Sequence, residues 1–182
     1  MMILGIDPSL THTGLVLLNG TTIYSETFET NSKEYIEKRL SDIRNRISEL
    51  LEIKKPDLCV IEGYAYHSFA AHSALLHELG GILKLLFYDA NIPFEIITPM
   101  SLKKFACGKA TKAEKSAIML SVFKDWGFDP KTDHEADAFV LAKMGEYLLE
   151  LKYSNKKLED FTDLSAPRRD VLKNILKKVS KT

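Results

Sequence analysis

The sequence is poor in cysteine, with two in 182 residues, and it has no excess of charge of either sign. Cys59 lies inside an apolar run and Cys107 in a segment rich in glycine and lysine. This excludes a disulfide-stapled scaffold, and we expect two reduced thiols. The 25 Lys and Arg balance 25 Asp and Glu. The chain therefore does not coat nucleic acid by net charge alone, although local clusters remain able to bind it.

A long apolar run is also missing. The longest apolar stretch, at about residues 74–90, is interrupted by His77, Glu78, Lys84 and Asp89, so it does not predict a membrane span. The N-terminus lacks the basic region and small-residue cleavage site of a signal peptide. We therefore expect a soluble, cytoplasmic protein in a reducing compartment, without a membrane partner.

The length predicts one main domain with a proper core, and no internal repeat or low-complexity stretch divides it. Residues 2–7 are typical of a buried strand, and residues 14–28 of a hairpin that turns at Asn19-Gly20. Residues 58–62 and 94–97 predict two more strands, each preceded by a helix, which favours parallel pairing. Helices are expected at about residues 33–53, 68–90, 100–106, 112–126 and 134–151.

The expected fold is thus α/β and RNase H-like: a five-stranded mixed sheet, three antiparallel strands and then two parallel ones, flanked by helices. Residues 152–182 differ from the rest, with nine Lys and Arg against four Asp and Glu. From about Pro167 apolar residues recur at helical spacing. We predict a domain over residues 1–151 and a basic C-terminal helical extension over residues 152–182.

Four possible metal ligands stand at the ends of expected elements. Asp7 and Glu62 each close an apolar strand, so both would lie at the mouth of one sheet, and hard divalent cations prefer such carboxylate oxygens. His134 and Asp137 are three residues apart and share a face if their segment is helical. The sequence therefore suggests one metal site formed by Asp7, Glu62, His134 and Asp137.

Each of these residues also has an ordinary structural explanation. Asp7 before Pro8 is typical of a strand-ending turn, and Glu62 before Gly63 is compatible with a solvated strand end. A lone helical histidine such as His134 more often lies at the surface. Asp133 is expected only to cap the helix that follows it. The metal site is the preferred interpretation because two buried runs deliver carboxylates to one sheet edge.

Five short motifs follow one another along the chain: Gly5-Ile6-Asp7-Pro8-Ser9, Thr13-Gly14, Val60-Ile61-Glu62, Ala113-Glu114-Lys115 and His134-Glu135-Ala136-Asp137-Ala138. In order and spacing they resemble the RuvC-type Holliday junction resolvases, a family of crossover junction endodeoxyribonucleases. The likeness covers about residues 2–150 and leaves the extension outside. It implies a homodimer that resolves four-way DNA junctions by paired symmetric nicks.

The resemblance also implies a cofactor, two Mg²⁺ ions per active site, for which Mn²⁺ would substitute. In this implied arrangement Asp7 bridges the ions, and Glu62 and Asp137 each complete the shell of one ion. His134 adds a neutral ligand beside Asp137. Imidazole is a softer ligand than a carboxylate and suits Mn²⁺ better than Mg²⁺.

Five lysines in residues 103–115 are candidate DNA contacts: Lys103, Lys104, Lys109, Lys112 and Lys115. A solvated face is the ordinary explanation for a lysine run. Here the run leads into a helix start, where backbone N–H groups and lysines together suit phosphate, so we favour DNA contact. The resemblance implies that Lys103 and Lys115 lie near the scissile phosphate, with Lys115 taking part in catalysis.

Tyr64 and Tyr66 flank Ala65, the position at which the resemblance implies an aromatic residue inserted into the junction. Either tyrosine would stack on an unpaired base or pack the base of a loop. Gly80-Gly81 would allow close approach of a second helix, in the partner subunit or in the same one.

Three other functions fit part of the sequence. A broader branched-DNA nuclease, acting on flaps, forks and Y-junctions, would use the same pocket. Residues 5–14 also resemble the phosphate-binding hairpin of actin-like and sugar-kinase-like nucleotide-binding proteins, but that fold needs a second half for which the chain has no room. A non-catalytic DNA-architecture protein would not need four ligand positions.

Truncation after Leu151 is expected to weaken DNA affinity, given the positive charge of the extension.

Overall fold

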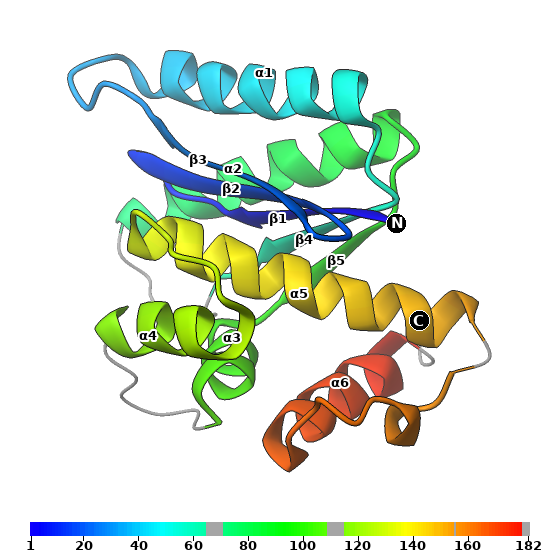
Figure 1. The fold of residues 1–182 in the computed structure, drawn as a ribbon. Helices are drawn as coiled ribbons and strands as arrows, with labels where there is room; N and C mark the ends of the chain where they lie inside the picture. Colours follow the sequence, from blue (N-terminus) through cyan, green and yellow to red (C-terminus); the bar gives the residue numbers. More distant parts are fainter. Residues whose placement is uncertain (65–70, 109–114, 155, 180–182) are drawn as a thin grey trace.

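A five-stranded mixed sheet forms the centre of the molecule (Figure 1). The computed structural model describes residues 1–64, 71–108, 115–154 and 156–179, and its strands lie in the order β3-β2-β1-β4-β5. β1 pairs antiparallel with β2 and β2 with β3, whereas β4 runs parallel to β1 and β5 to β4. The expected RNase H-like sheet is thereby confirmed. Its strands are β1 (Met2–Asp7), β2 (His12–Asn19), β3 (Thr22–Glu29), β4 (Leu58–Glu62) and β5 (Phe94–Ile97).

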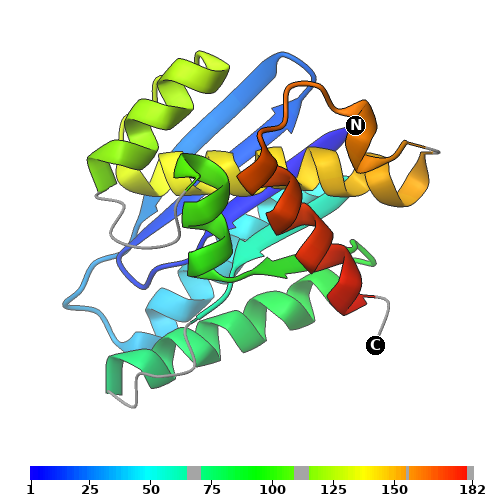
Figure 2. The same cartoon turned by 90° about the horizontal axis from the view of Figure 1, so that it is seen from below.

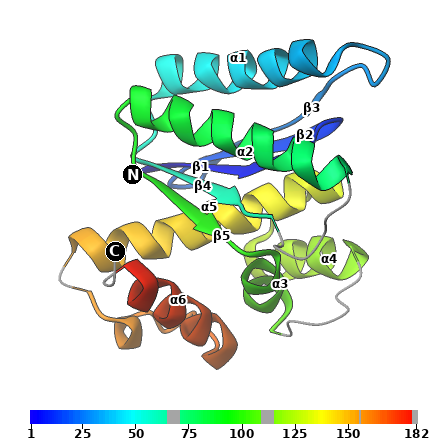
Figure 3. The same cartoon turned by 180° about the vertical axis from the view of Figure 1, so that it is seen from behind.

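Helices cover both faces of the sheet (Figures 1 and 3). One face carries α1 (Ile36–Lys54) and α2 (Ala71–Asp89). The other carries α5 (Asp133–Tyr153), and beyond it lie α3 (Pro99–Cys107), α4 (Lys115–Trp126) and α6 (Ala166–Val179). Because side chains of a strand alternate between faces, Leu4 packs towards α1 and α2 while Ile3 packs towards α5. Burial on both sides explains why β1 is apolar throughout.

Glycines let α5 lie unusually close to the sheet. A Cβ atom on Gly5 of β1 would lie 2.0 Å from the backbone oxygen of Ala138, and one on Gly14 of β2 would lie 2.1 Å from that of His134. From the helix side, a Cβ on Gly145 would lie 2.5 Å from Ile3. Backbone atoms cannot give way by such amounts, so positions 5 and 14 require glycine, whereas a Cβ at position 145 would displace the Ile3 side chain. The start of α5 is therefore held against the ends of β1 and β2.

Helix ends differ from the sequence expectation where side chains bond to the backbone. α1 begins at Ile36 rather than near residue 33, because the Asn31 side chain accepts from the Lys33 N–H (3.0 Å) and forms a competing turn. The expectation that Asp133 caps α5 is wrong. Thr132 is the cap, since its hydroxyl accepts from the Glu135 N–H at 3.1 Å. α5 then continues to Tyr153.

The C-terminal segment packs into the core on the α5 face. A short 3-10 helix, η1 (Leu158–Asp160), precedes α6, which lies beside α3 in Figure 2. Phe161, Leu164, Val171 and Leu172 are buried in the same apolar cluster as α5 and α3. The segment thus contributes apolar surface to the fold as well as charge. Within the described ranges, no helix combines the length and apolar character that crossing a bilayer requires.

Candidate metal centre

Strand alternation and register bring Asp7 and Glu62 together. Asp7 follows Gly5 by two residues and so faces α5, as Gly5 does. The same alternation in β4 gives Glu62 the same face. In the parallel pairing of β1 with β4, Ile6 lies level with Ile61. The residues that follow, Asp7 and Glu62, therefore meet at the carboxyl ends of two neighbouring strands.

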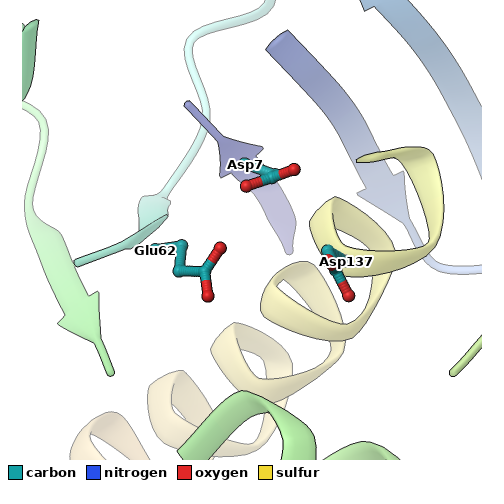
Figure 4. A group of neighbouring side chains, drawn as sticks. All are labelled: Asp7, Glu62 and Asp137. Carbon is teal, nitrogen blue, oxygen red and sulfur yellow. The ribbon is translucent and has the colours of Figure 1, made fainter. Parts of the chain in front are cut away.

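Asp137 enters the same place from the first turns of α5. The carboxylates of Asp7, Glu62 and Asp137 each offer an oxygen within 4.8 Å of the others, and Figure 4 shows them turned towards one another. Asp7 is buried and the other two are half-buried. Three acidic groups from three elements thus converge on one small volume.

Burial and mutual repulsion make these carboxylates difficult to ionise together. Burial, and then the charge of Asp7, raise the pKa of Glu62 to about 9. Burial and the charge of Asp7 likewise raise the pKa of Asp137 to about 7. The Lys103 ammonium lowers both pKa values, but by less than these two causes raise them. A divalent cation would remove the repulsion, because it favours the ionised form of every ligand.

One buried atom supports a fit to metal directly. Among the described residues, Oδ1 of Asp137 is buried and has no hydrogen-bond partner. Such an atom costs free energy unless a donor or a cation satisfies it. The donor set consists of hard oxygen atoms, which suit Mg²⁺, Ca²⁺ or Mn²⁺ rather than soft metals. The residues present therefore fit a divalent cation.

The raised pKa of Glu62 predicts that Glu62→Gln stabilises the metal-free protein at pH 8. The unfolded chain ionises Glu62 near its ordinary value of 4.5, whereas the folded chain keeps the proton to about 9. The free energy of unfolding thus falls as pH rises through this window. We expect the variant to unfold about 5 °C higher at pH 8, which corresponds to about 2 kcal/mol in a chain of this size, with a much smaller difference at pH 5.

Thermal unfolding with and without Mg²⁺ provides the check. Mg²⁺ should raise the midpoint of the parent protein far more than that of Glu62→Gln, because only the parent keeps the full ligand set. Glu52→Gln, at an exposed position on α1, is the control. Equal midpoints for the parent and Glu62→Gln at pH 8 would contradict the prediction.

His134 lies beside Asp7. Its Nδ1 atom is 2.6 Å from Oδ2 of Asp7, and its ring stacks on His12 at 5.8 Å between centroids. His12 in turn lies 3.8 Å from a carboxylate oxygen of Glu29. His12 and His134 are far apart in the chain, and nothing local in the sequence links them. In the pairing of β1 with β2, however, Asp7 lies opposite Gly14, and Gly14 lies against the backbone of His134 at the start of α5.

The lysines expected to contact DNA fall into three groups. Lys103 lies on α3, and its charge acts on Glu62 and Asp137. Lys104, its neighbour, lies 3.7 Å from Asp170 of α6. Lys115 is the first residue of α4, but its side chain lies outside the described part of the chain, as do Lys109, Lys112 and Tyr66.

Tyr64 packs inside the subunit. Its ring lies 5.4 Å from that of His77, and a Cβ on Gly80 would lie 2.8 Å from it. The sequence left open whether Gly80 packs within its own subunit or against the partner subunit. In the structure Gly80 packs against Tyr64 of the same chain, whereas nothing lies within 4 Å of a Cβ at Gly81. The Tyr64 hydroxyl is buried and has no hydrogen-bond partner among the described residues. Stacking on DNA would require this ring to leave its present site.

The fold and the carboxylate cluster together define an RNase H-like protein with a candidate metal centre at the carboxyl ends of β1 and β4. A family described as "Crossover junction endodeoxyribonuclease RuvC" matches residues 3–144. The chain therefore belongs to the RuvC family, and it is an endonuclease that acts on DNA. The resemblance in the five motifs is thereby confirmed.

Individual relatives agree with this assignment. RuvC of Petrotoga mobilis is 29% identical over 149 residues, which cover 78% of this chain and 91% of that protein. The structure of Thermus thermophilus RuvC matches with a TM-score of 0.69 at 23% identity, covering 84% of this chain and 97% of that one. The same protein in complex with a Holliday junction substrate gives 0.66 at 24% identity, covering 78% and 90%. These structures support the fold.

Proposed function

We propose that this chain resolves four-way DNA junctions by paired symmetric nicks that leave 5′-phosphate and 3′-hydroxyl ends. The observation that carries the proposal is the convergence of Asp7, Glu62 and Asp137 within 4.8 Å, in a chain of the RuvC family. A relative with the same fold is known in complex with a Holliday junction substrate. A nuclease of broader branched-DNA specificity remains the second candidate, because the same centre would serve it.

The metal centre is proposed to hold two Mg²⁺ ions per active site, with Mn²⁺ as a substitute. Asp7, the most buried of the three carboxylates, would hold the ions together with Glu62 and Asp137. Two such metal ions would supply an activated water and would neutralise the charge on the phosphate and on the leaving oxygen. His134 is proposed as a further ligand, since its Nδ1 already lies beside Oδ2 of Asp7.

The protein's own groups prepare this centre for a phosphodiester. Burial excludes water around Asp7, which strengthens every charge interaction there. The positive charge of Lys103 acts on Glu62 and Asp137, and it would attract the scissile phosphate there. Lys115, at the N-terminus of α4, is proposed to act with it.

A homodimer is part of the proposal. A four-way junction offers two equivalent strands, and two equivalent active sites related by a two-fold axis would cut both. One chain holds one carboxylate cluster among its described residues, so symmetric paired nicking requires a second copy.

Cleavage of a matched set of DNA substrates tests this function. The purified chain is incubated with a labelled four-way junction, a Y-fork, a flap and a linear duplex of the same sequence, with and without Mg²⁺. We expect symmetric nicks confined to the junction and dependent on the metal. Comparable cutting of forks and flaps would favour the broader nuclease. Absence of cutting on every substrate with either Mg²⁺ or Mn²⁺ would overturn the proposal.

His134 gives a prediction about metal preference. Because imidazole suits Mn²⁺ better than Mg²⁺, Mn²⁺ should support cleavage at least as well as Mg²⁺ in the parent protein. His134→Asp would create an all-oxygen site and should lower the Mn²⁺/Mg²⁺ rate ratio by about tenfold, a difference of about 1.4 kcal/mol in metal preference. The ratio is measured at fixed pH, with His12→Asn as the control. An unchanged ratio would remove His134 from the ligands.

Lys103 and Lys104 form a matched pair for the phosphate contact. Lys103→Ala is expected to slow cleavage at saturating protein by about 10–100-fold, the loss of a charge-assisted contact of about 1.5–3 kcal/mol. Lys104→Ala should affect cleavage much less, because Lys104 lies beside Asp170. Junction affinity measured over a salt series should lose slope in proportion to the phosphate contacts removed. Equal slowing by the two substitutions would argue against a specific role of Lys103.

A further inference from the structure

Arg168, near the start of α6, reaches across to the end of α3. Its guanidinium donates to the backbone oxygens of Phe105 (2.9 Å) and Ala106 (3.3 Å), and to the carboxylate of Asp125 on α4. Its Cζ atom lies 4.3 Å from the centre of the Trp126 ring. Only 12% of the side chain is exposed. Arg168 therefore links α3, α4 and α6, and little of its side chain is accessible to another molecule.

Arg168 bonds to the backbone oxygens that the end of a helix leaves without partners. The last backbone oxygens of a helix have no partners within it, and a positive charge is favourable there. Arginine offers several N–H donors in one plane together with a flat face that stacks on an aromatic ring. Ser121 of α4 also donates to Ala106, at 2.6 Å. The last turn of α3 is thus held by α4 and α6 together.

α3 also carries two side chains whose charges or titration are linked to the metal centre. Lys103 and Cys107 are four residues apart and so share one face of the helix. The charge of Lys103 lowers the pKa values of Glu62 and Asp137. Burial, and then the charge of Asp137, raise the pKa of Cys107, while the charge of Arg168 lowers it by less. Both side chains therefore lie within electrostatic reach of the carboxylates. α3 is thus bonded to Arg168 at its last turn and carries Lys103 within reach of the carboxylates.

We propose that Arg168 is a positioning residue for cleavage, which holds the last turn of α3 so that Lys103 is presented to the scissile phosphate. This role rests on the proposed junction cleavage. It assigns a task to a part of the chain beyond residue 144, where the match to the family ends. The C-terminal segment would then have two separate effects. Arg168 would position α3, and the basic residues of the segment would attract DNA.

Three single substitutions in the full-length chain distinguish these effects. Arg168→Ala should slow single-turnover cleavage at saturating protein by about tenfold, since small displacements of a positioned group are costly. Arg168→Lys keeps the charge and much of the stem but loses the planar set of donors, so we expect it to be slowed nearly as much. Lys173→Ala removes the same charge from an exposed position of α6 and should cleave at the normal rate. Full rescue by lysine, or equal slowing in Lys173→Ala, would overturn the positioning role.

A double substitution tests whether Arg168 acts through Lys103. If it does, Arg168→Lys combined with Lys103→Ala should cleave no more slowly than Lys103→Ala alone, whereas independent effects would multiply. Junction affinity without Mg²⁺, which a lost positioning contact should change less than twofold, separates binding from cleavage. Multiplied losses would overturn this inference while leaving the proposed function intact. If the parent itself cleaved no junction, the proposed function would fail, and the positioning role with it.

Discussion

Asp7→Asn is expected to lower the rate of junction cleavage by at least ~10³-fold, a loss of about 4 kcal/mol of transition-state stabilisation. Asp7 is the most buried of the three clustered carboxylates, and its charge raises the pKa values of both Glu62 and Asp137. Asparagine keeps the shape of the side chain but removes the charge that would hold two cations. Junction binding should persist, because the basic residues remain.

Binding and cleavage must therefore be measured on the same preparation. Junction affinity is determined without Mg²⁺, and the single-turnover rate with it, for the parent, Asp7→Asn and Asp89→Asn. The last makes the same chemical change at an exposed position of α2, outside the cluster of three carboxylates, and should change the rate less than about threefold, or about 0.7 kcal/mol. Joint loss of binding and cleavage would indicate misfolding. Substantial cleavage by Asp7→Asn would remove Asp7 from the site.

Gly5→Ala is expected to damage stability and activity together. The added Cβ would lie 2.0 Å from the Ala138 backbone oxygen and 2.7 Å from the Ala142 backbone nitrogen, so α5 must move away from β1. Forced repacking of this kind costs about 1–3 kcal/mol, which in a chain of this size lowers the unfolding midpoint by roughly 3–10 °C. Because Asp137 is part of α5, a shift of the helix would displace its carboxylate. Cleavage by the folded fraction should therefore also fall, by roughly 10²-fold for a displacement of about 1 Å.

Gly81→Ala is the matched control. Nothing lies within 4 Å of a Cβ at this position, and alanine in a helix is favoured over glycine by up to about 1 kcal/mol. The control should be as stable as the parent or more so, because the added methyl group meets no atom of its own subunit. If Gly5→Ala had normal stability and normal cleavage, the close approach of α5 would not be what sets the position of Asp137.

Two other functions suggested by the sequence lose support. The hairpin of residues 5–14 resembles a phosphate-binding hairpin, but the described residues contain one five-stranded sheet rather than two related halves. Membership of an endonuclease family disfavours a purely architectural DNA-binding role. The same membership leaves the choice between junctions and other branched DNA to substrate cleavage experiments.

The sequence by itself determined the sheet and the location of the carboxylates. Apolar runs, the Asn19-Gly20 turn and the alternation of strands with helices are local signals, and they predicted all five strands and their directions. Asp7 and Glu62 follow from the same signals, because parallel strands bring their carboxyl ends to one edge. Asp137 required the motif resemblance as well, since helical spacing alone does not say what a helix faces.

Only the tertiary structure decided how close α5 lies and what the C-terminal segment does. The contact of Gly5 with Ala138, the pairing of His134 with Asp7 and the seating of Tyr64 against Gly80 join residues far apart in the chain. The composition of residues 152–182 indicated charge, yet Arg168 is used inside the fold, on the carbonyls of α3 and the ring of Trp126. Periodicity reports which side of an element is apolar, whereas packing and electrostatics depend on which element covers that side, and that choice is made only when the whole chain folds.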